Sequence, residues 1–284
     1  MTASLSRRTF LGVAAGAAGC AWVGRALRAA EYIAADGKPG GFLLGIQSYS
    51  LRHYKVEEAL RHVHEFGLHS IEFFDGHFSH ESSPAQIDAM KKRCAALDIK
   101  ILGHGVDGFG KDHEANRKYF EFAKRAGIRN LSADPSEDAF DSLDKLVAEY
   151  DIRIAIHNHG PGARYDKIAD VLNAVKGRHK NIGACADLGH YIRSAEDPIK
   201  AITLLQGRLF GIHLKDFAEP RGDAPGVILG KGQLDVDGVF QALKKVKFPA
   251  DGCLSLEYEE HPDNPLADIR ECLAIATEAA KKVE

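Results

Sequence analysis

Short apolar runs alternate with longer amphipathic runs along the chain from Phe42 onward. The apolar runs predict eight strands: Leu43–Ser50, Ser70–Asp75, Ile99–Gly105, Asn130–Ala133, Arg153–His159, Asn181–Asp187, Leu209–Asp216 and Cys253–Glu259. The amphipathic runs predict helices: Val56–Phe66, Ala85–Leu97, His113–Ala126, Ala139–Tyr150, Tyr165–Val175, Pro198–Leu205, Val236–Val246 and Pro265–Lys282. Strands that alternate with helical segments of about ten or more residues indicate parallel βαβ units. Eight such units predict a single α/β domain, a closed (β/α)8 TIM barrel.

An open, doubly wound parallel sheet is the alternative fold for the same alternation. The dinucleotide-binding form of that sheet carries G-x-G-x-x-G directly after its first strand. No such motif follows the first predicted strand, Leu43–Ser50. We therefore expect the closed barrel.

Polar residues collect near the ends of several predicted strands. Because successive side chains on a strand point to opposite faces, each strand has an outward and an inward set. In Leu209–Asp216 the large apolar residues share one face, and His213 and Lys215 share the other. The same alternation turns further polar residues inward: His157, His159, Asp187 and Glu257. Barrel enzymes build their active sites at these carboxyl ends of the strands.

Four of the inward residues predict a metal site, because they come from four successive strands: His157, Asp187, His213 and Glu257. Two imidazoles and two carboxylates suit one divalent ion. Mixed nitrogen and oxygen ligation favours manganese, cobalt, iron or zinc over magnesium. The alternative is four unrelated polar residues, each hydrogen-bonded at a loop mouth. That alternative suits any one of them alone, whereas the set of four favours the metal site.

A second group of polar residues is placed to reach a ligand. Substrate contacts are predicted for four residues: Glu72, His104, His190 and Lys215. Catalytic roles are predicted for Glu257, His159, His190 and Lys215, the first three as bases and the lysine as the group that stabilises an oxyanion. A solvated rim lysine and a hydrogen-bonded capping histidine remain open for Lys215 and His104. Asp216 has outward parity, so we expect it to make a loop hydrogen bond or a helix cap.

The first 30 residues have the composition of an export signal. Arg7 and Arg8 stand directly before the apolar, alanine- and glycine-rich run Leu11–Gly24, and small residues follow. This order predicts a Tat-type signal peptide over residues 1–30, a linker over 31–41 and the barrel over 42–284. The apolar run is too short to span a bilayer comfortably, so no membrane span is expected.

We expect the mature protein to be periplasmic or secreted. Lipoprotein anchoring at Cys20 is a weaker alternative, and a buried N-terminal helix is another. Removal of residues 1–30 takes away four of the 37 lysines and arginines and none of the 40 acidic residues, which leaves a formal charge of −7. A chain of that charge is a poor partner for nucleic acid. The remaining cysteines form no C-x-x-C pair, so the sequence signals neither a cysteine zinc site nor a redox motif.

The motifs resemble those of the xylose isomerase-like TIM barrels, the sugar phosphate isomerase/epimerase family. The resemblance covers about residues 42–280. It rests on five short motifs: Ile71-Glu72, Asn158-His159, Asp187-x-x-His190, His213-Leu214-Lys215-Asp216 and Glu257. Members include ketose epimerases, hydroxypyruvate isomerase, inosose dehydratase, AP endonucleases and enzymes that cleave 3-keto-glycosides. The resemblance implies metal-dependent chemistry on a sugar.

One position departs from that family. His157 stands where the family usually has a metal-binding glutamate, whereas Asp187, His213 and Glu257 match the other ligand positions. Ketose epimerases of this type resemble two-carboxylate enzymes, with one glutamate on each side of the carbon that inverts. With Glu257 as the only matched carboxylate base, symmetrical epimerisation loses support. Elimination or hydration beside a ketone, and aldose–ketose isomerisation, gain it.

These features predict an exported, divalent-metal-dependent enzyme that removes a proton beside a carbonyl of a sugar or polyol. The expected partner is a small-molecule substrate and not nucleic acid, and a homo-oligomer is left open. A non-catalytic sugar-binding barrel is the first alternative. An AP endonuclease-like nuclease is the second, but such enzymes use three metal ions and need a basic surface, which the charge of −7 opposes.

Overall fold

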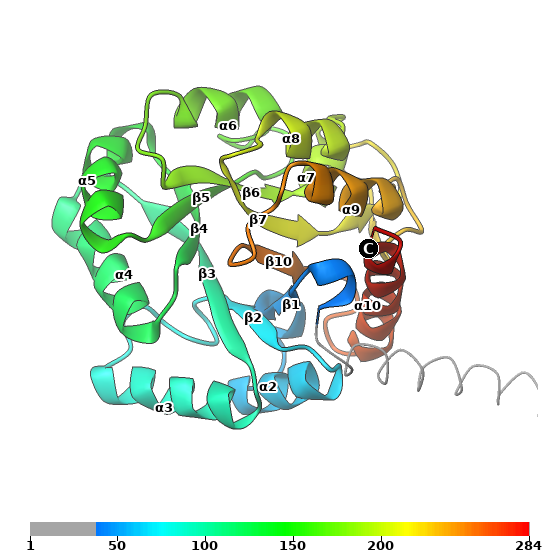
Figure 1. Cartoon of the computed structure of the whole chain (residues 1–284), viewed down its shortest axis with the longest axis horizontal. Coiled ribbons are helices and arrows are strands. Elements are labelled where there is room, and N and C mark those ends of the chain that lie inside the picture. The colour runs from blue at the N-terminus through cyan, green and yellow to red at the C-terminus, as the bar shows by residue number, and fades with distance from the viewer. Residues whose placement is uncertain (1–37, 284) are drawn as a thin grey trace, which may run out of the picture.

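The computed structural model describes residues 38–283, and within them eight parallel strands close into a barrel (Figure 1). The strands follow one another around the barrel in the order β1-β10-β7-β6-β5-β4-β3-β2. Their bounds are β1 Leu44–Gln47, β2 Ser70–Phe73, β3 Lys100–Phe109, β4 Asn130–Pro135, β5 Arg153–His157, β6 Ile182–Asp187, β7 Leu209–Leu214 and β10 Cys253–Leu256. The predicted TIM barrel is therefore confirmed.

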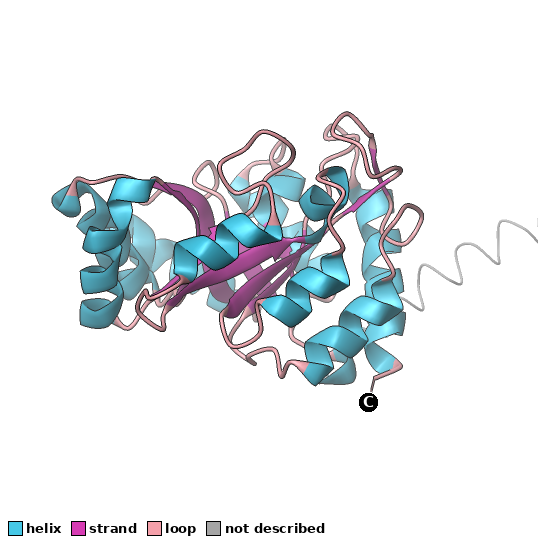
Figure 2. Ribbon diagram, turned by 90° about the horizontal axis from the view of Figure 1, so that it is seen from above, coloured by secondary structure: helices cyan, strands magenta, loops and turns pink. Residues whose placement is uncertain are grey.

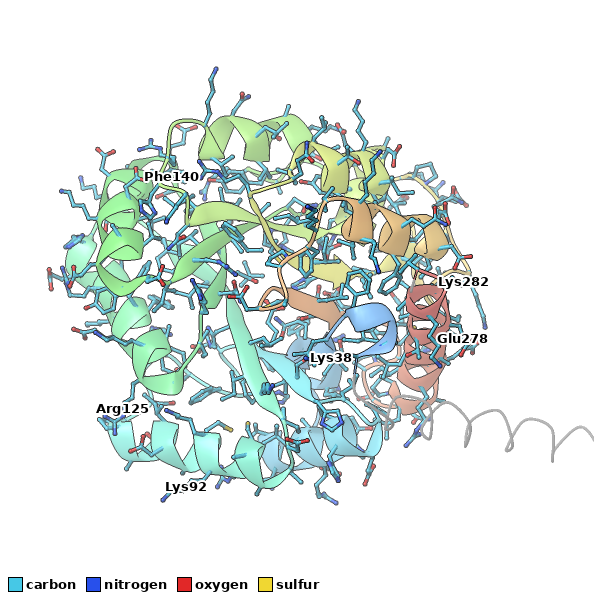
Figure 3. All side chains as sticks on the ribbon, in the orientation of Figure 1. Lys38, Lys92, Arg125, Phe140, Glu278 and Lys282 are labelled. Carbon is cyan, nitrogen blue, oxygen red and sulfur yellow. The ribbon has the colours of Figure 1, made fainter. Side chains whose placement is uncertain are left out.

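Helices surround the strands, as the view from above shows (Figure 2). Their bounds are α2 Val56–Glu65, α3 Pro84–Ala96, α4 His113–Ala126, α5 Phe140–Tyr150, α6 Ile168–Val175, α7 Leu188–Arg193, α8 Pro198–Leu204, α9 Val236–Lys245 and α10 Leu266–Lys281. Their apolar faces pack on the strands and form one large core. Charged side chains lie on the outer surface, among them Lys92, Arg125, Glu278 and Lys282 (Figure 3).

Several strands end earlier than the sequence pattern predicts. The strand expected to reach His159 ends at His157, and the strand expected to reach Glu259 ends at Leu256. β7 ends at Leu214, and the next residues form the short hairpin of β8 (Asp216–Phe217) and β9 (Gly226–Val227). Alternation of polar and apolar residues continues past the last ladder hydrogen bond, because loop residues at a barrel mouth also face inward or outward. The site residues consequently lie at the strand ends or directly after them.

Helix α7 was not expected from the sequence. It begins directly after β6 because the Asp187 carboxylate caps it, accepting a hydrogen bond of 2.7 Å from the backbone amide of His190. A cap of this kind satisfies an amide that the first helical turn leaves without a partner. The short helix thereby holds His190 directly above the end of β6.

The described part of the predicted linker, residues 38–41, packs against the barrel. Pro39–Gly41 form a single 3-10 turn, and Gly40 lies so close to α10 that a Cβ there would stand 2.0 Å from the carbonyl oxygen of Ala280. The predicted signal peptide, residues 1–30, lies outside the described residues. Between residues 38 and 283 no helix is long and apolar enough to cross a bilayer.

Candidate metal centre and active site

The four predicted metal ligands meet at one end of the barrel. His157 and Asp187 are the last residues of β5 and β6, His213 lies near the end of β7, and Glu257 follows β10 directly. Each of the four offers a ligand atom, and these atoms all lie within 4.8 Å of one another. All four side chains are buried. Adjacent parallel strands with matched register bring them together, since Asp187 pairs with His213 and His157 pairs with Cys185.

The distances between these atoms suit a single ion. His213 Nδ1 lies 3.0 Å from His157 Nε2 and 3.1 Å from Glu257 Oε2. Asp187 Oδ2 lies 3.6 Å from His157 Nε2 and 3.9 Å from His213 Nδ1. Ligand atoms bound to one ion at about 2.1 Å stand roughly 3.0–3.6 Å apart at angles of about 90–120°. Most of the observed separations fall within or close to that range.

Several atoms of the cluster lack hydrogen-bond partners. Asp187 Oδ2 and Glu257 Oε2 are buried and accept no hydrogen bond, although the Lys215 ammonium lies nearby. A buried carboxylate oxygen is costly unless a cation compensates it, and the Lys215 ammonium lies against both oxygens. Two imidazole nitrogens and two carboxylate oxygens are the donor set of manganese, iron, cobalt and zinc sites. The residues present therefore fit a divalent metal ion.

Lys215 lies against the same cluster, as its inward parity predicted. Its Nζ stands 2.7 Å from Glu257 Oε2, 3.0 Å from Asp187 Oδ2 and 3.1 Å from Glu259 Oε1. Burial favours the neutral amine, but the three carboxylates outweigh it and raise the pKa of Lys215 above its ordinary value. The ammonium is only 5% exposed, so the alternative of a solvated rim lysine does not describe it.

The carboxylates of the cluster are ionised. Burial raises the pKa of Glu257, but Lys215 and His213 outweigh it, and the net pKa lies well below the usual range. Burial also raises the pKa of Asp187, and the neighbouring His190 and Lys215 reverse this and hold the pKa well below its usual value. These two ionised carboxylates are the groups that a divalent cation would bind, beside the Lys215 ammonium.

His159 and His190 form the outer edge of the cluster. The His159 ring centroid lies 4.6 Å from that of His157 and 5.5 Å from that of His190. Burial, with the neighbouring His157, lowers the pKa of His159 to about 4. Burial also lowers the pKa of His190 to about 3, although Asp187 opposes the shift. Both imidazoles are therefore neutral at neutral pH and have a lone pair with which to accept a proton.

The structure separates two of the predicted substrate contacts from the mouth of the barrel. Glu72 on β2 is fully buried and hydrogen-bonded to His213, Ser132 and Ser255. His104 on β3 is equally buried, and both of its ring nitrogens are occupied, Nδ1 by Asp107 at 2.8 Å and Nε2 by the carbonyl of Phe78 at 2.8 Å. Neither side chain has a free group that faces the metal ligands from the solvent side.

Asp216 organises the loop over the site, in agreement with its expected loop hydrogen bond. Its buried carboxylate accepts hydrogen bonds of 2.8–3.0 Å from five backbone amides: Phe217, Gly230, Gly232, Gln233 and Leu234. The loop places Phe217 against His190, with ring centroids 6.2 Å apart and stacked. Arg193 then lies 5.1 Å from the Phe217 ring centroid and donates to the carbonyl of Gly222.

Sequence reasoning missed three kinds of residue around the site. Ser132 and Ser255 lie inside the barrel and donate to Glu72. Glu259 pairs with Lys215, and Phe217 packs on His190. The inward parity of Ser255 and Glu259 was readable from the strand pattern, whereas their partners depend on which strands face each other across the barrel.

Comparison with known proteins places this site in a family. A family model described as a xylose isomerase-like TIM barrel matches residues 60–278. The 3-oxo-isoapionate decarboxylase of Pectobacterium atrosepticum is 26% identical over 179 residues, which are 57% of this chain and 63% of that protein. The inosose dehydratase of Clostridium botulinum is 27% identical over 142 residues, 44% of this chain and 47% of that protein. The matches thus span less than two thirds of either curated relative.

A solved structure resembles the chain over most of its length. An uncharacterized protein from Parabacteroides distasonis is 29% identical, with a TM-score of 0.65, and the match covers 85% of this chain and 98% of that one. The family model covers more than half of the 284 residues and includes all four residues of the buried cluster. The chain belongs to the xylose isomerase-like TIM barrel family.

Proposed function

We propose that the protein is a divalent-metal-dependent enzyme that transfers a proton at the carbon beside the carbonyl of a keto-sugar or keto-polyol, in an elimination, a hydration or an isomerisation. The observation that carries the proposal is the buried cluster of His157, Asp187, His213 and Glu257 with the Lys215 ammonium against two of its oxygens. The similarity to proteins named 3-oxo-isoapionate decarboxylase and inosose dehydratase supports the same class of substrate.

The four residues of the cluster would hold the ion through His157 Nε2, His213 Nδ1 and one oxygen of each carboxylate. When bound, the ion would polarise a substrate carbonyl and stabilise negative charge on its oxygen. Lys215 supplies a second positive charge beside the same place, with its three N–H donors. It is held there by Asp187, Glu257 and Glu259.

The proton beside the carbonyl would pass to an imidazole. His159 and His190 are neutral and border the cluster, so either can accept a proton. Glu257 was an equal candidate from the sequence, but its Oε2 lies within the ligand cluster, 2.7 Å from Lys215 Nζ and 3.1 Å from His213 Nδ1. We therefore assign the base to His159 or His190 and keep Glu257 as a ligand.

The substitution of His157 for the family glutamate favours one-sided chemistry. An epimerase of the two-carboxylate type needs a base on each face of the inverting carbon. An imidazole whose Nε2 points into the ligand cluster has that lone pair engaged and cannot accept a proton there. Elimination, hydration or isomerisation requires a base on one face only, and the pair of His159 and His190 provides it.

The test is solvent exchange with keto-sugars and inososes. The protein lacking residues 1–30 is loaded with manganese or cobalt, and deuterium entry beside the carbonyl is followed by NMR in D2O. We expect exchange or product formation that falls by about 10²–10⁴-fold in His159→Gln or His190→Gln, the usual cost of losing a general base. Binding of the sugars with neither exchange nor turnover would favour the non-catalytic sugar-binding barrel.

We also propose that the enzyme is exported by the Tat route. The support is the Arg7-Arg8 pair before the apolar run Leu11–Gly24. Replacement of both arginines by lysine should retain the full-length chain in the cytoplasm. Unchanged export of that variant, measured by fractionation and mass spectrometry of the N-terminus, would contradict this route.

A further inference from the structure

Glu72 crosses the interior of the barrel to reach a metal ligand. It lies on β2, and its Oε2 stands 3.0 Å from His213 Nε2 on β7, three strands away around the barrel. The neighbouring strand makes room for the side chain, since a Cβ at Gly103 would lie 3.3 Å from Glu72 Cγ and 2.5 Å from Cys253 Sγ. The carboxylate is 0% exposed and meets the His213 ring at Nε2, the nitrogen that does not face the other three ligands.

Every hydrogen bond of Glu72 is one that an ionised carboxylate makes. Oε1 accepts from the Ser132 hydroxyl, and Oε2 accepts from the Ser255 hydroxyl at 2.8 Å and from His213 Nε2. An ionised carboxylate has no proton to donate, so the hydrogen between Glu72 and His213 belongs to the imidazole.

That hydrogen bond fixes which nitrogen of His213 can bind a cation. With a proton held on Nε2, Nδ1 is the nitrogen that would offer a lone pair to a bound cation. Nδ1 is the atom that faces His157 Nε2 at 3.0 Å and Glu257 Oε2 at 3.1 Å. Outer partners of this kind orient metal-binding histidines and increase their basicity.

The same atoms permit a competing interpretation. Glu72, Cys185 and His213 also offer three ligand atoms within 4.8 Å of one another. The Glu72 oxygens already accept three hydrogen bonds, one of them from His213 Nε2. The other nitrogen of that ring faces His157 and Glu257, so the inner group supports the outer cluster through hydrogen bonds.

We propose that Glu72 is a positioning residue that sets the tautomer and direction of His213 for metal binding, with Ser132 and Ser255 holding the carboxylate in place. The inference rests on the metal site of the proposed function. It replaces the substrate contact expected from the sequence with a role below the metal site.

The experiment compares Glu72→Gln with His104→Asn, a matched control that alters a buried, carboxylate-paired histidine away from the ligand cluster. The dissociation constant for Mn²⁺ is measured by titration of the free-ion EPR signal, and the Co²⁺-loaded proteins are compared by visible absorption. We expect about 10–100-fold weaker Mn²⁺ binding and an altered Co²⁺ spectrum for Glu72→Gln, the usual cost of losing an outer partner. His104→Asn should bind as the wild type does. Equal binding and identical spectra in Glu72→Gln and the wild type would overturn the inference.

Two further measurements keep the result interpretable. Ser255→Ala removes one hydrogen-bond donor to Glu72 and keeps the negative charge of Glu72. It should therefore weaken Mn²⁺ binding by less than Glu72→Gln does. NMR of ¹⁵N-histidine-labelled, metal-free wild type should show a protonated Nε2 on His213, whether or not Glu72→Gln folds. An unprotonated Nε2 there would refute the role of Glu72, whereas a wild type that binds no Mn²⁺ would refute the metal site itself.

Discussion

Two buried histidines of this barrel, His104 and His213, have similar surroundings at one ring nitrogen and different surroundings at the other. His104 and His213 are both 0% exposed, and each pairs one ring nitrogen with a buried carboxylate, Asp107 or Glu72. The other nitrogen of His104 meets the carbonyl of Phe78, whereas that of His213 meets His157 and Glu257. Burial and a carboxylate partner therefore do not distinguish a structural histidine from a metal ligand. The group that faces the second ring nitrogen distinguishes them.

The largest difference should appear in metal binding. His213→Ala removes one of four ligand atoms, so Mn²⁺ affinity should fall by more than about 1,000-fold, beyond the roughly 10–100-fold cost of losing an outer partner. His104→Ala should leave the dissociation constant unchanged. Isothermal titration of both variants measures the contrast, and a large loss in His104→Ala would show that the two histidines share one network.

The structural role of His104 should appear in stability. His104→Ala leaves Asp107 and the Phe78 carbonyl buried without their partner, and removing one member of such a pair costs about 3–5 kcal/mol. Urea denaturation of the metal-free protein measures this. A cost below about 1 kcal/mol would mean that water replaces the imidazole and that the pocket is not closed.

Added metal should separate the two variants again. A ligand that binds only the native state stabilises it by about 2.7 kcal/mol when the free ligand concentration is 100 times the dissociation constant. We expect this gain for the wild type and His104→Ala in thermal unfolding, and none for His213→Ala. A gain of similar size in His213→Ala would place the ion elsewhere in the protein.

The smallest effect is a pH dependence that belongs to His104. Burial lowers the pKa of His104, but Asp107 outweighs it, so the net pKa is raised. Stability from a raised pKa is present in full below the unfolded value of about 6.5 and is lost as pH rises through the folded value. The stability difference between wild type and His104→Asn should therefore shrink as pH rises, by about 1.4 kcal/mol for each unit of pKa shift. Measurement in EDTA at pH 6 to 9 tests this, and a difference that grows with pH would reverse the sign.

The sequence predicted the barrel and the ligand cluster through the same alternation. Strand periodicity of two turned His157, Asp187, His213 and Glu257 inward, and parallel strands bring their carboxyl ends to one rim. This local rule needs no knowledge of which strands face each other.

The remaining contacts depend on distances across the barrel and on loop backbone, which periodicity does not encode. Glu72 reaches His213 only because β2 and β7 face each other across the interior. His104 is closed off by a backbone carbonyl in the loop after β2, and Asp216 accepts hydrogen bonds from the backbone amides of residues 217, 230 and 232–234. Helix α7 was missed because Asp187 ends a strand and caps a helix at the same residue.

The most direct test of the account is metal analysis of the protein lacking residues 1–30, beside His157→Ala and His104→Asn. We predict about one equivalent of manganese, cobalt, iron or zinc in the wild type and in His104→Asn, and loss of it in His157→Ala. Absence of metal from the wild type after reloading, or full retention in His157→Ala, would contradict the four-residue metal centre.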